Sequence, residues 1–381
     1  MRFNNTVLIK SLLFTLLFCN GCNPFYVTRA AYEEIKILNR RESISEIIKK
    51  KSLPPDQLAK LELILSAREY AIQIGLKPKD TFTQYAEITN TPLVWIVSAS
   101  EADSFTPYTW WFPIVGSVPY KGYFSKNDAL DLAAKLRSDG YETYIRGADA
   151  FSTLGWFNDP VLSSILKGDD AQIVSTVIHE IVHTTLWFPN LVTLNESMAH
   201  FIGLKESINF FDIQLLNCKN CSEEKLSHLK QAKKMAETRF SHNLIISEVV
   251  MDLYENLNKL YKSSLSKEEK LKQRQDLFSV ESNSLRDKMP NLRILNKINN
   301  AEIMHLKLYL TNLIGFKRLY DYSDQNIVTF LQKVENLLKK ARKSSSAESL
   351  EDRFFKELSD LVRTTPLRPD APDLKICKNA L

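Results

Sequence analysis

The chain has 381 residues, of which 44% are hydrophobic and 25% charged, and its formal net charge at pH 7 is only +5. This length and composition suit a globular protein with one large core or two joined cores. Basic residues are scattered among acidic ones apart from short runs, so the sequence offers no broad basic face and argues against a nucleic-acid partner.

The first 22 residues have the layout of an export signal. Arg2 and Lys10 precede a short apolar run, residues 11–18, and Gly21-Cys22 follows it. The run is too short to span a bilayer. We expect residues 1–21 to be removed and a lipid on Cys22 to anchor the protein in a bacterial membrane, with the outer membrane facing the periplasm favoured by the following Asn. A soluble secreted protein cut at the same bond is the alternative.

The rest of the chain predicts a mainly α protein with a small β-sheet, an α+β fold. Residues 22–80 have helical periodicity broken by Pro54-Pro55, which predicts two helices. Residues 81–210 contain the β-like stretches and are expected to form a zincin-like catalytic region. Within it, the strands are expected at 94–98, 107–124 and 142–146, with a helix at 126–139. The 107–124 stretch is our candidate for an edge strand along which a substrate could lie.

Residues 211–381 predict a helical C-terminal region. An apolar stripe at helical spacing runs from 226 to 260, and a polar stretch at 262–290 follows it. Two further helices are expected between 294 and 338, and a last helix after the serines at 344–346. Cys218 and Cys221 predict a local disulfide in an oxidising compartment, whereas Cys377 has no obvious partner.

The sequence His179-Glu180-Ile181-Val182-His183 lies in a stretch without Pro or Gly that predicts one apolar helix. Two histidines four residues apart point the same way from a helix, so they can share one Zn²⁺ ion. Glu180 can then accept a proton from water on that ion.

Glu196 follows His183 at the gluzincin spacing, within Asn195-Glu196-Ser197-Met198-Ala199, and can supply the third ligand from a second helix. Two other interpretations remain open. Thr193 and Glu196 also fit a helix capping box, and His200, one turn beyond Glu196, could be a rival ligand.

Other groups should orient the ligands or stabilise the oxyanion. Asn195, Ser197 and the polar loop of the 150s are candidates for orienting the histidines. Tyr309, Tyr120 and Tyr123 are candidates for oxyanion stabilisation, and we select Tyr309 as the catalytic tyrosine. Ala199 is small enough to let two helices approach closely.

Several motifs together resemble a bacterial family of lipoproteins identified as zinc aminopeptidases. They are Gly21-Cys22, Tyr120-x-Gly122-Tyr123-Phe124-Ser125, Ser152-Thr153-Leu154-Gly155-Trp156-Phe157-x-Asp159-Pro160, the two motifs above, and Asn299-Asn300-Ala301 with Tyr309. The resemblance implies zinc-dependent aminopeptidase activity, with His179, His183 and Glu196 as ligands and Glu180 catalytic. Trp111 and Ser117 stand where the family carries two cysteines, which implies loss of one disulfide, and His200 replaces a small polar residue.

The sequence therefore predicts a lipid-anchored zinc peptidase, most simply an aminopeptidase, with a peptide substrate. Asp159 is one candidate for holding the substrate's free amine, although it could equally cap a turn. The alternatives are a zinc endopeptidase and a non-catalytic binding lipoprotein that retains the metal site only as a structural element.

Overall fold

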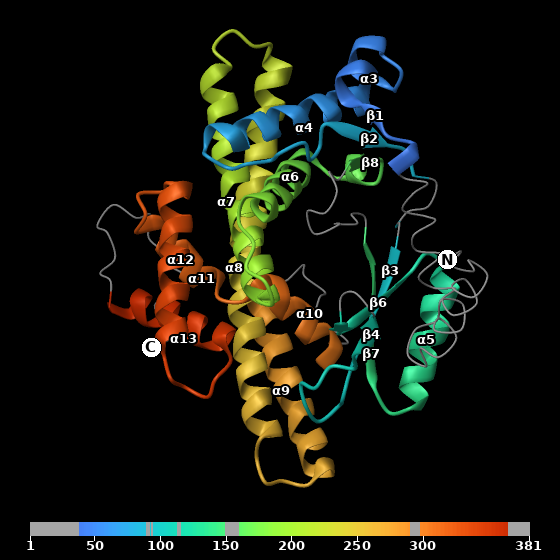
Figure 1. Cartoon of the computed structure of the whole chain (residues 1–381), viewed down its shortest axis with the longest axis vertical. Coiled ribbons are helices and arrows are strands. Elements are labelled where there is room, and N and C mark those ends of the chain that lie inside the picture. The colour runs from blue at the N-terminus through green and yellow to red at the C-terminus, as the bar shows by residue number, and fades with distance from the viewer. Residues whose placement is uncertain are drawn as a thin grey trace, which may run out of the picture.

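The computed structural model describes residues 38–88, 92, 94–112, 116–148, 160–289 and 298–364. The protein is mainly helical with small sheets, which confirms the α+β class (Figure 1). Cys22, Asp159 and Cys377 lie outside the described residues. No helix among the described residues has the length and apolar character needed to cross a membrane.

The N-terminal helices break where the prolines predict. Helix α3 (Ile44–Lys50) ends at Lys51 in the left-handed conformation, and α4 (Pro55–Gln73) begins with Pro55 at its first position, where the missing N–H costs nothing. Beside them lies a small sheet in the order β1 (Glu42–Ser43), β2 (Gln84–Ala86), β8 (Val161–Leu162). A short 3-10 helix, Ile165–Lys167, leads from β8 towards the helical core.

A second sheet, antiparallel and in the order β6-β3-β7, forms one wall of the αβ portion. Its strands are β6 (Tyr120–Tyr123), β3 (Val94–Ser100) and β7 (Glu142–Ala148), and a hairpin of β4 (Trp110–Phe112) and β5 (Gly116–Val118) precedes β6. One face packs on α5 (Lys126–Ser138) through Trp95, Val97 and Ile145. The stretch expected as one edge strand is thus three strands, of which β6 forms an edge of the sheet.

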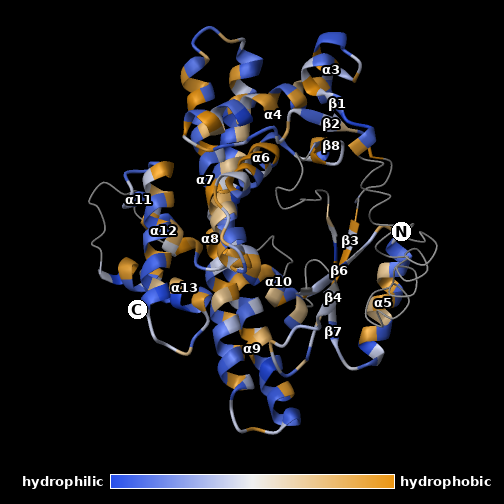
Figure 2. Ribbon diagram, viewed as in Figure 1, coloured by the Kyte–Doolittle hydropathy of each residue, from blue (hydrophilic) through white to orange (hydrophobic). Residues whose placement is uncertain are grey.

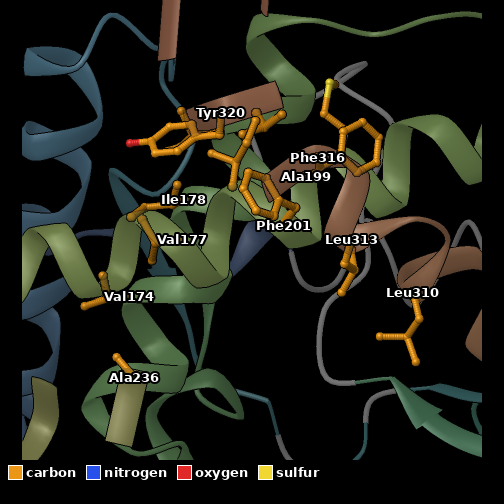
Figure 3. Packing of buried hydrophobic residues seen from close by; sticks show 14 of the residues in the cluster. Val174, Val177, Ile178, Ala199, Phe201, Ala236, Leu310, Leu313, Phe316 and Tyr320 are labelled. Carbon is orange, nitrogen blue, oxygen red and sulfur yellow. The ribbon is translucent and has the colours of Figure 1, made fainter. Parts of the chain in front are cut away.

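Helices α6 (Asp170–Thr185) and α7 (Val192–Asn217) cross in the centre of the core. Figure 3 shows Val174, Val177 and Ile178 of α6 facing the apolar cluster that also contains Ala199 and Phe201 of α7. One face of α6, formed by seven buried side chains, packs in the apolar core, which holds the helix in its position. This rigidity matters because the histidines project from its remaining edge.

Two long antiparallel helices, α8 (Glu223–Tyr261) and α9 (Lys267–Lys288), form a hairpin beside this pair (Figure 1). The apolar stripe lies on α8 alone. The polar stretch proves to be α9, which opens with a capping box at Ser266 and buries only Arg274, Phe278 and Leu285. Figure 2 shows how largely hydrophilic α9 is. Cys218 and Cys221, in the turn before α8, form the expected disulfide.

Three helices, not two, lie between residues 294 and 343: α10 (Asn300–Leu310), α11 (Leu313–Asp321) and α12 (Ile327–Lys343). The prediction missed the break between α10 and α11, because the residues there, Thr311 and Asn312, are neither Pro nor Gly. Asn312 adopts a positive φ of 55° and caps α11 with its own side chain. The last helix, α13 (Leu350–Thr364), packs on α11 and α12.

A buried carboxylate links the N-terminal helices to the C-terminal ones. Glu206 of α7 is 1% exposed. It accepts hydrogen bonds of 2.5 Å from the hydroxyls of Tyr70 (α4) and Tyr320 (α11), and one of 3.1 Å from Asn209. A buried charge is tolerated only when it is paired or fully hydrogen-bonded, so this contact holds α4, α7 and α11 in one arrangement.

Candidate metal site

Three side chains predicted as ligands meet at the crossing of α6 and α7. Nε2 of His179 lies 3.1 Å from Nε2 of His183. The carboxylate oxygens of Glu196 lie 3.4 Å from Nε2 of His179 and 3.7 Å from Nε2 of His183. Among the described residues this is the one group of His, Cys, Asp and Glu side chains whose geometry could hold a metal ion.

The separations fit a tetrahedral metal centre. Ligand atoms about 2.0–2.1 Å from a tetrahedral ion are about 3.4 Å from one another. The two imidazole nitrogens are 3.1 Å apart, and one oxygen of Glu196 lies 3.4 Å from His179 while the other lies 3.7 Å from His183, so the three side chains converge on a space of that size. Two imidazoles and one carboxylate leave a fourth position for water, as in catalytic centres. All three side chains are less than a fifth exposed.

The charge of Glu196 also suits a cation. Burial alone would raise the pKa of Glu196, but the imidazoles of His179 and His183 outweigh burial and hold that pKa well below its usual range. Glu196 is therefore ionised at neutral pH. Glu180, next to His179 on α6, is half-buried, and its negative charge acts to raise the pKa of His179.

The capping-box interpretation of Glu196 is wrong. Helix α7 begins at Val192 with no side-chain cap. Thr193 instead hydrogen-bonds Glu351 of α13, which also accepts from the backbone N–H of Leu194 at 2.8 Å. The carboxylate of Glu196 is thus free of the helix end and faces the histidines.

His200 lies beside the site without joining the ligand group. Its ring centre is 6.4 Å from that of His179, and its Nε2 is 2.9 Å from the side-chain oxygen of Asn243. Burial lowers the pKa of His200 to about 4, so it is a neutral neighbour. Nδ1 of His183 is buried and has no hydrogen-bond partner among the described residues.

Asn195 and Ser197 do not orient the histidines as predicted. The side chain of Asn195 accepts from the N–H of Phe188 at 2.9 Å and donates to its carbonyl at 2.8 Å. The hydroxyl of Ser197 donates to the carbonyl of Leu308 at 2.8 Å and accepts from the N–H of Thr311. Both residues therefore fix the backbone around Glu196 rather than the imidazoles.

Gly203, which sequence reasoning missed, sets the spacing of the two helices. It lies two turns after Glu196, on the same face of α7. A Cβ atom there would come 2.5 Å from the carbonyl oxygen of Ser175 and 3.2 Å from Cβ of His179. The role assigned to Ala199, close approach of the helices, thus falls to Gly203 at the level of His179.

Tyr309 and His305 of α10 approach the ligands from another side. The ring centre of Tyr309 is 6.3 Å from that of His179, and His305 is 5.4 Å from Tyr309. Burial and the charge of Glu196 raise the pKa of Tyr309, whereas burial lowers the pKa of His305 to about 3. The result is a protonated phenol beside a neutral imidazole, and sequence reasoning did not find His305.

The register of the sheet separates the two remaining tyrosine candidates. Tyr120 pairs with Ser98, and Tyr123 pairs with Trp95 on the face that packs against α5. Since successive residues of a strand face opposite sides, Tyr123 is directed away from the ligands. Tyr120 is on the opposite face, the one towards the candidate ligands. It is close enough to Glu196 for that charge, together with burial, to raise its pKa.

The match to a protein family agrees with this geometry. Residues 25–349 match the model of a family described as "Putative aminopeptidase". The chain belongs to this family. No curated protein and no solved structure matches it. The matched span includes the three ligand candidates, Glu180 and the whole of α10.

The close approach at Gly203 predicts that replacing it with alanine destabilises the protein. In an unconstrained helix, Gly→Ala stabilises by about 0.8–1 kcal/mol. Here Gly203→Ala would push α7 away from Ser175 and His179, and we expect a loss of about 1–3 kcal/mol in the free energy of unfolding, with weaker metal binding. Urea denaturation and metal titration of the purified protein would measure both.

Gly168→Ala is the matched control, because a Cβ at Gly168 meets nothing closer than 3.4 Å and its φ of −66° suits any residue. A Gly203→Ala variant as stable as wild type, with unchanged metal affinity, would contradict the close approach inferred here.

Proposed function

We propose that the protein is a zinc-dependent aminopeptidase of the gluzincin type, with His179, His183 and Glu196 as zinc ligands. The family indicates a peptidase, which acts on peptide substrates. The observation that supports zinc most directly is the convergence of the two imidazole nitrogens, 3.1 Å apart, and the Glu196 carboxylate, with one ligand atom from each side chain within 4.8 Å of the others.

Bound zinc would supply a water of lowered pKa, near 7, and polarise the scissile carbonyl. Glu180 follows His179 directly on α6 and is not one of the three ligand candidates. Its carboxylate can accept the proton of the attacking water and later deliver it to the departing amine. We therefore assign Glu180 as the general base and acid.

Tyr309 can stabilise the developing oxyanion. Its raised pKa keeps the phenol protonated at neutral pH, so it can donate a hydrogen bond to the carbonyl oxygen of the substrate. Its position beside His179 supports this role, because His179 is one of the proposed ligands. His305, neutral and in ring contact with Tyr309, is placed to hold that ring.

Glu180→Gln tests the assignment of the base. This change keeps the size of the side chain but removes proton transfer, so we expect kcat on aminoacyl chromogenic substrates to fall about 10²–10⁴-fold while bound zinc stays at the wild-type level. Elemental analysis and steady-state kinetics measure the two quantities. Glu62→Gln, at an exposed site on α4, is the control.

Four outcomes would count against the proposal. Full activity of Glu180→Gln would exclude it as the base, and zinc retention by a His183→Ala, Glu196→Gln double variant would exclude the ligand set. Stoichiometric zinc without turnover of any peptide would favour the non-catalytic binding protein. Cleavage of N-terminally blocked peptides would favour an endopeptidase.

Tyr309→Phe tests the oxyanion role. Because the hydrogen bond strengthens only as negative charge develops, its loss should lower kcat by about 10²–10³-fold with little change in KM. Tyr322→Phe, at an exposed tyrosine at the end of α11, should change neither constant. If KM rose by the same factor while kcat stayed unchanged, Tyr309 would instead be a residue that binds the substrate.

We further propose that the protein is exported and anchored by a lipid on Cys22, in the outer membrane facing the periplasm. The basic residues, the short apolar run and Gly21-Cys22 support this. Radiolabelled palmitate should label the wild type and not Cys22→Ser, and Cys22→Ser should move from the membrane to the soluble fraction. A wild-type protein that is soluble and unlabelled would exclude the anchor.

A further inference from the structure

A cationic side chain, Arg146, lies on the metal-facing side of the β6-β3-β7 sheet. Arg146 pairs with Ile96 of β3, and Tyr144 pairs with Ser98. Residues two apart on a strand share a face, so Arg146 and Tyr144 face the same way. Tyr144 stacks on His305 of α10 with ring centres 5.2 Å apart.

Strand β7 and helix α10 run side by side in the same direction. At their starts, the carboxylate of Glu142 accepts from the N–H of Asn300 at 2.8 Å. Four residues along β7, at about 3.3 Å each, span about 13 Å, and nine residues along α10, at 1.5 Å each, span about the same. Arg146 therefore lies level with Tyr309, which lies beside His179.

The electrostatics agree with this placement. The positive charge of Arg146 acts on Tyr309, Tyr120 and His305, and Glu196 acts on the same three side chains. These three side chains thus lie within reach of both charges, the guanidinium of β7 and the carboxylate at the ligand group.

Arg146 has no ion-pair partner in the described part of the chain. It is half-buried, and no described carboxylate lies within 4.0 Å of it. By contrast, Arg274 is paired with Glu142 at 2.5 Å and hydrogen-bonds the carbonyl of Ala102. A partly desolvated guanidinium without a counter-ion is costly and offers two parallel donors to a carboxylate.

We propose that Arg146 binds a carboxylate of the substrate next to the scissile bond, which makes peptides with a carboxylate close to that bond the preferred substrate class. The carboxylate has two sources, the side chain of an N-terminal Asp or Glu and the terminal carboxylate of a dipeptide. This inference rests on the proposed peptidase function, which it makes more specific.

Matched substrate pairs separate the two sources. The first pair is the Glu and Gln aminoacyl chromogenic substrates, which differ only in the charge of the side chain. The second pair is the dipeptide Leu-Ala and its amide, which differ only at the C-terminus. For one of these pairs the wild-type zinc enzyme should prefer the carboxylate by about 10–100-fold in kcat/KM, the range of a charge-assisted hydrogen bond.

Arg146→Met should bring that ratio close to one, and Arg146→Lys should retain only part of it because a single ammonium cannot bind in bidentate fashion. Arg137→Met is the control. Arg137 is on α5, across the sheet, where it donates to Thr143 at 2.7 Å, and its loss should leave the ratio unchanged.

Two results would overturn the inference: a wild-type enzyme that discriminates within neither pair, or an Arg146→Met variant that loses activity equally on both members of the pair. Calorimetric binding to the Glu180→Gln variant needs no turnover. Tighter binding of the carboxylate member there supports the role of Arg146 even if the peptidase proposal fails, and equal binding of both members overturns it even if hydrolysis is observed.

Discussion

The site depends on how closely α6 and α7 approach each other. Glu196 meets both imidazoles because α7 packs against α6, with Gly203 at a close approach two turns further along α7. Gly203 permits this contact, because its missing side chain leaves room for the carbonyl oxygen of Ser175 and the Cβ of His179. Since one face of α6 is packed in the apolar core, a shift of α6 to make room for a larger residue would disturb that packing. The relative positions of the three ligand side chains therefore depend on this crossing.

The residues on either side of Glu196 hold the backbone around it in place through hydrogen bonds. Asn195 makes two hydrogen bonds to the backbone of Phe188 in the turn that joins α6 to α7, which fixes the start of α7 relative to the histidine helix. Ser197 bonds the backbone of Leu308 and Thr311 around the end of α10, and Leu308 is the neighbour of Tyr309. One tripeptide thus holds a candidate ligand in register with both the imidazoles and the candidate oxyanion donor. This explains physically why polar residues flank Glu196 within a buried helix.

Much of this could be predicted from the sequence wherever a local pattern determines the outcome. The spacing of His179 and His183, the break at Pro54-Pro55 and the alternating strands all depend on nearest neighbours along the chain. The features that the sequence did not predict depend on contacts between residues far apart along the chain. Helix α9 is polar because it packs on α8 along a narrow strip, Thr193 turns to Glu351 of a helix more than 150 residues away, and the distinction between Tyr120 and Tyr123 required the register of β6 on β3. Arg146 and His305 join the site only through the alignment of β7 with α10.

Helix α7 carries two carboxylates whose different surroundings bear on whether the site holds an ion. Glu206 is satisfied by neutral donors, the hydroxyls of Tyr70 and Tyr320 and the amide of Asn209, so it needs no cation. In the described part of the chain, Glu196 faces two imidazole nitrogens, which also face each other at 3.1 Å. If both imidazoles are neutral, each has a single N–H to place on either of its nitrogens, and the three groups together hold more lone pairs than protons to share among them. A divalent cation at their centre accepts those lone pairs and balances the charge of Glu196, which is why the arrangement favours a metal centre over a structural hydrogen-bond cluster.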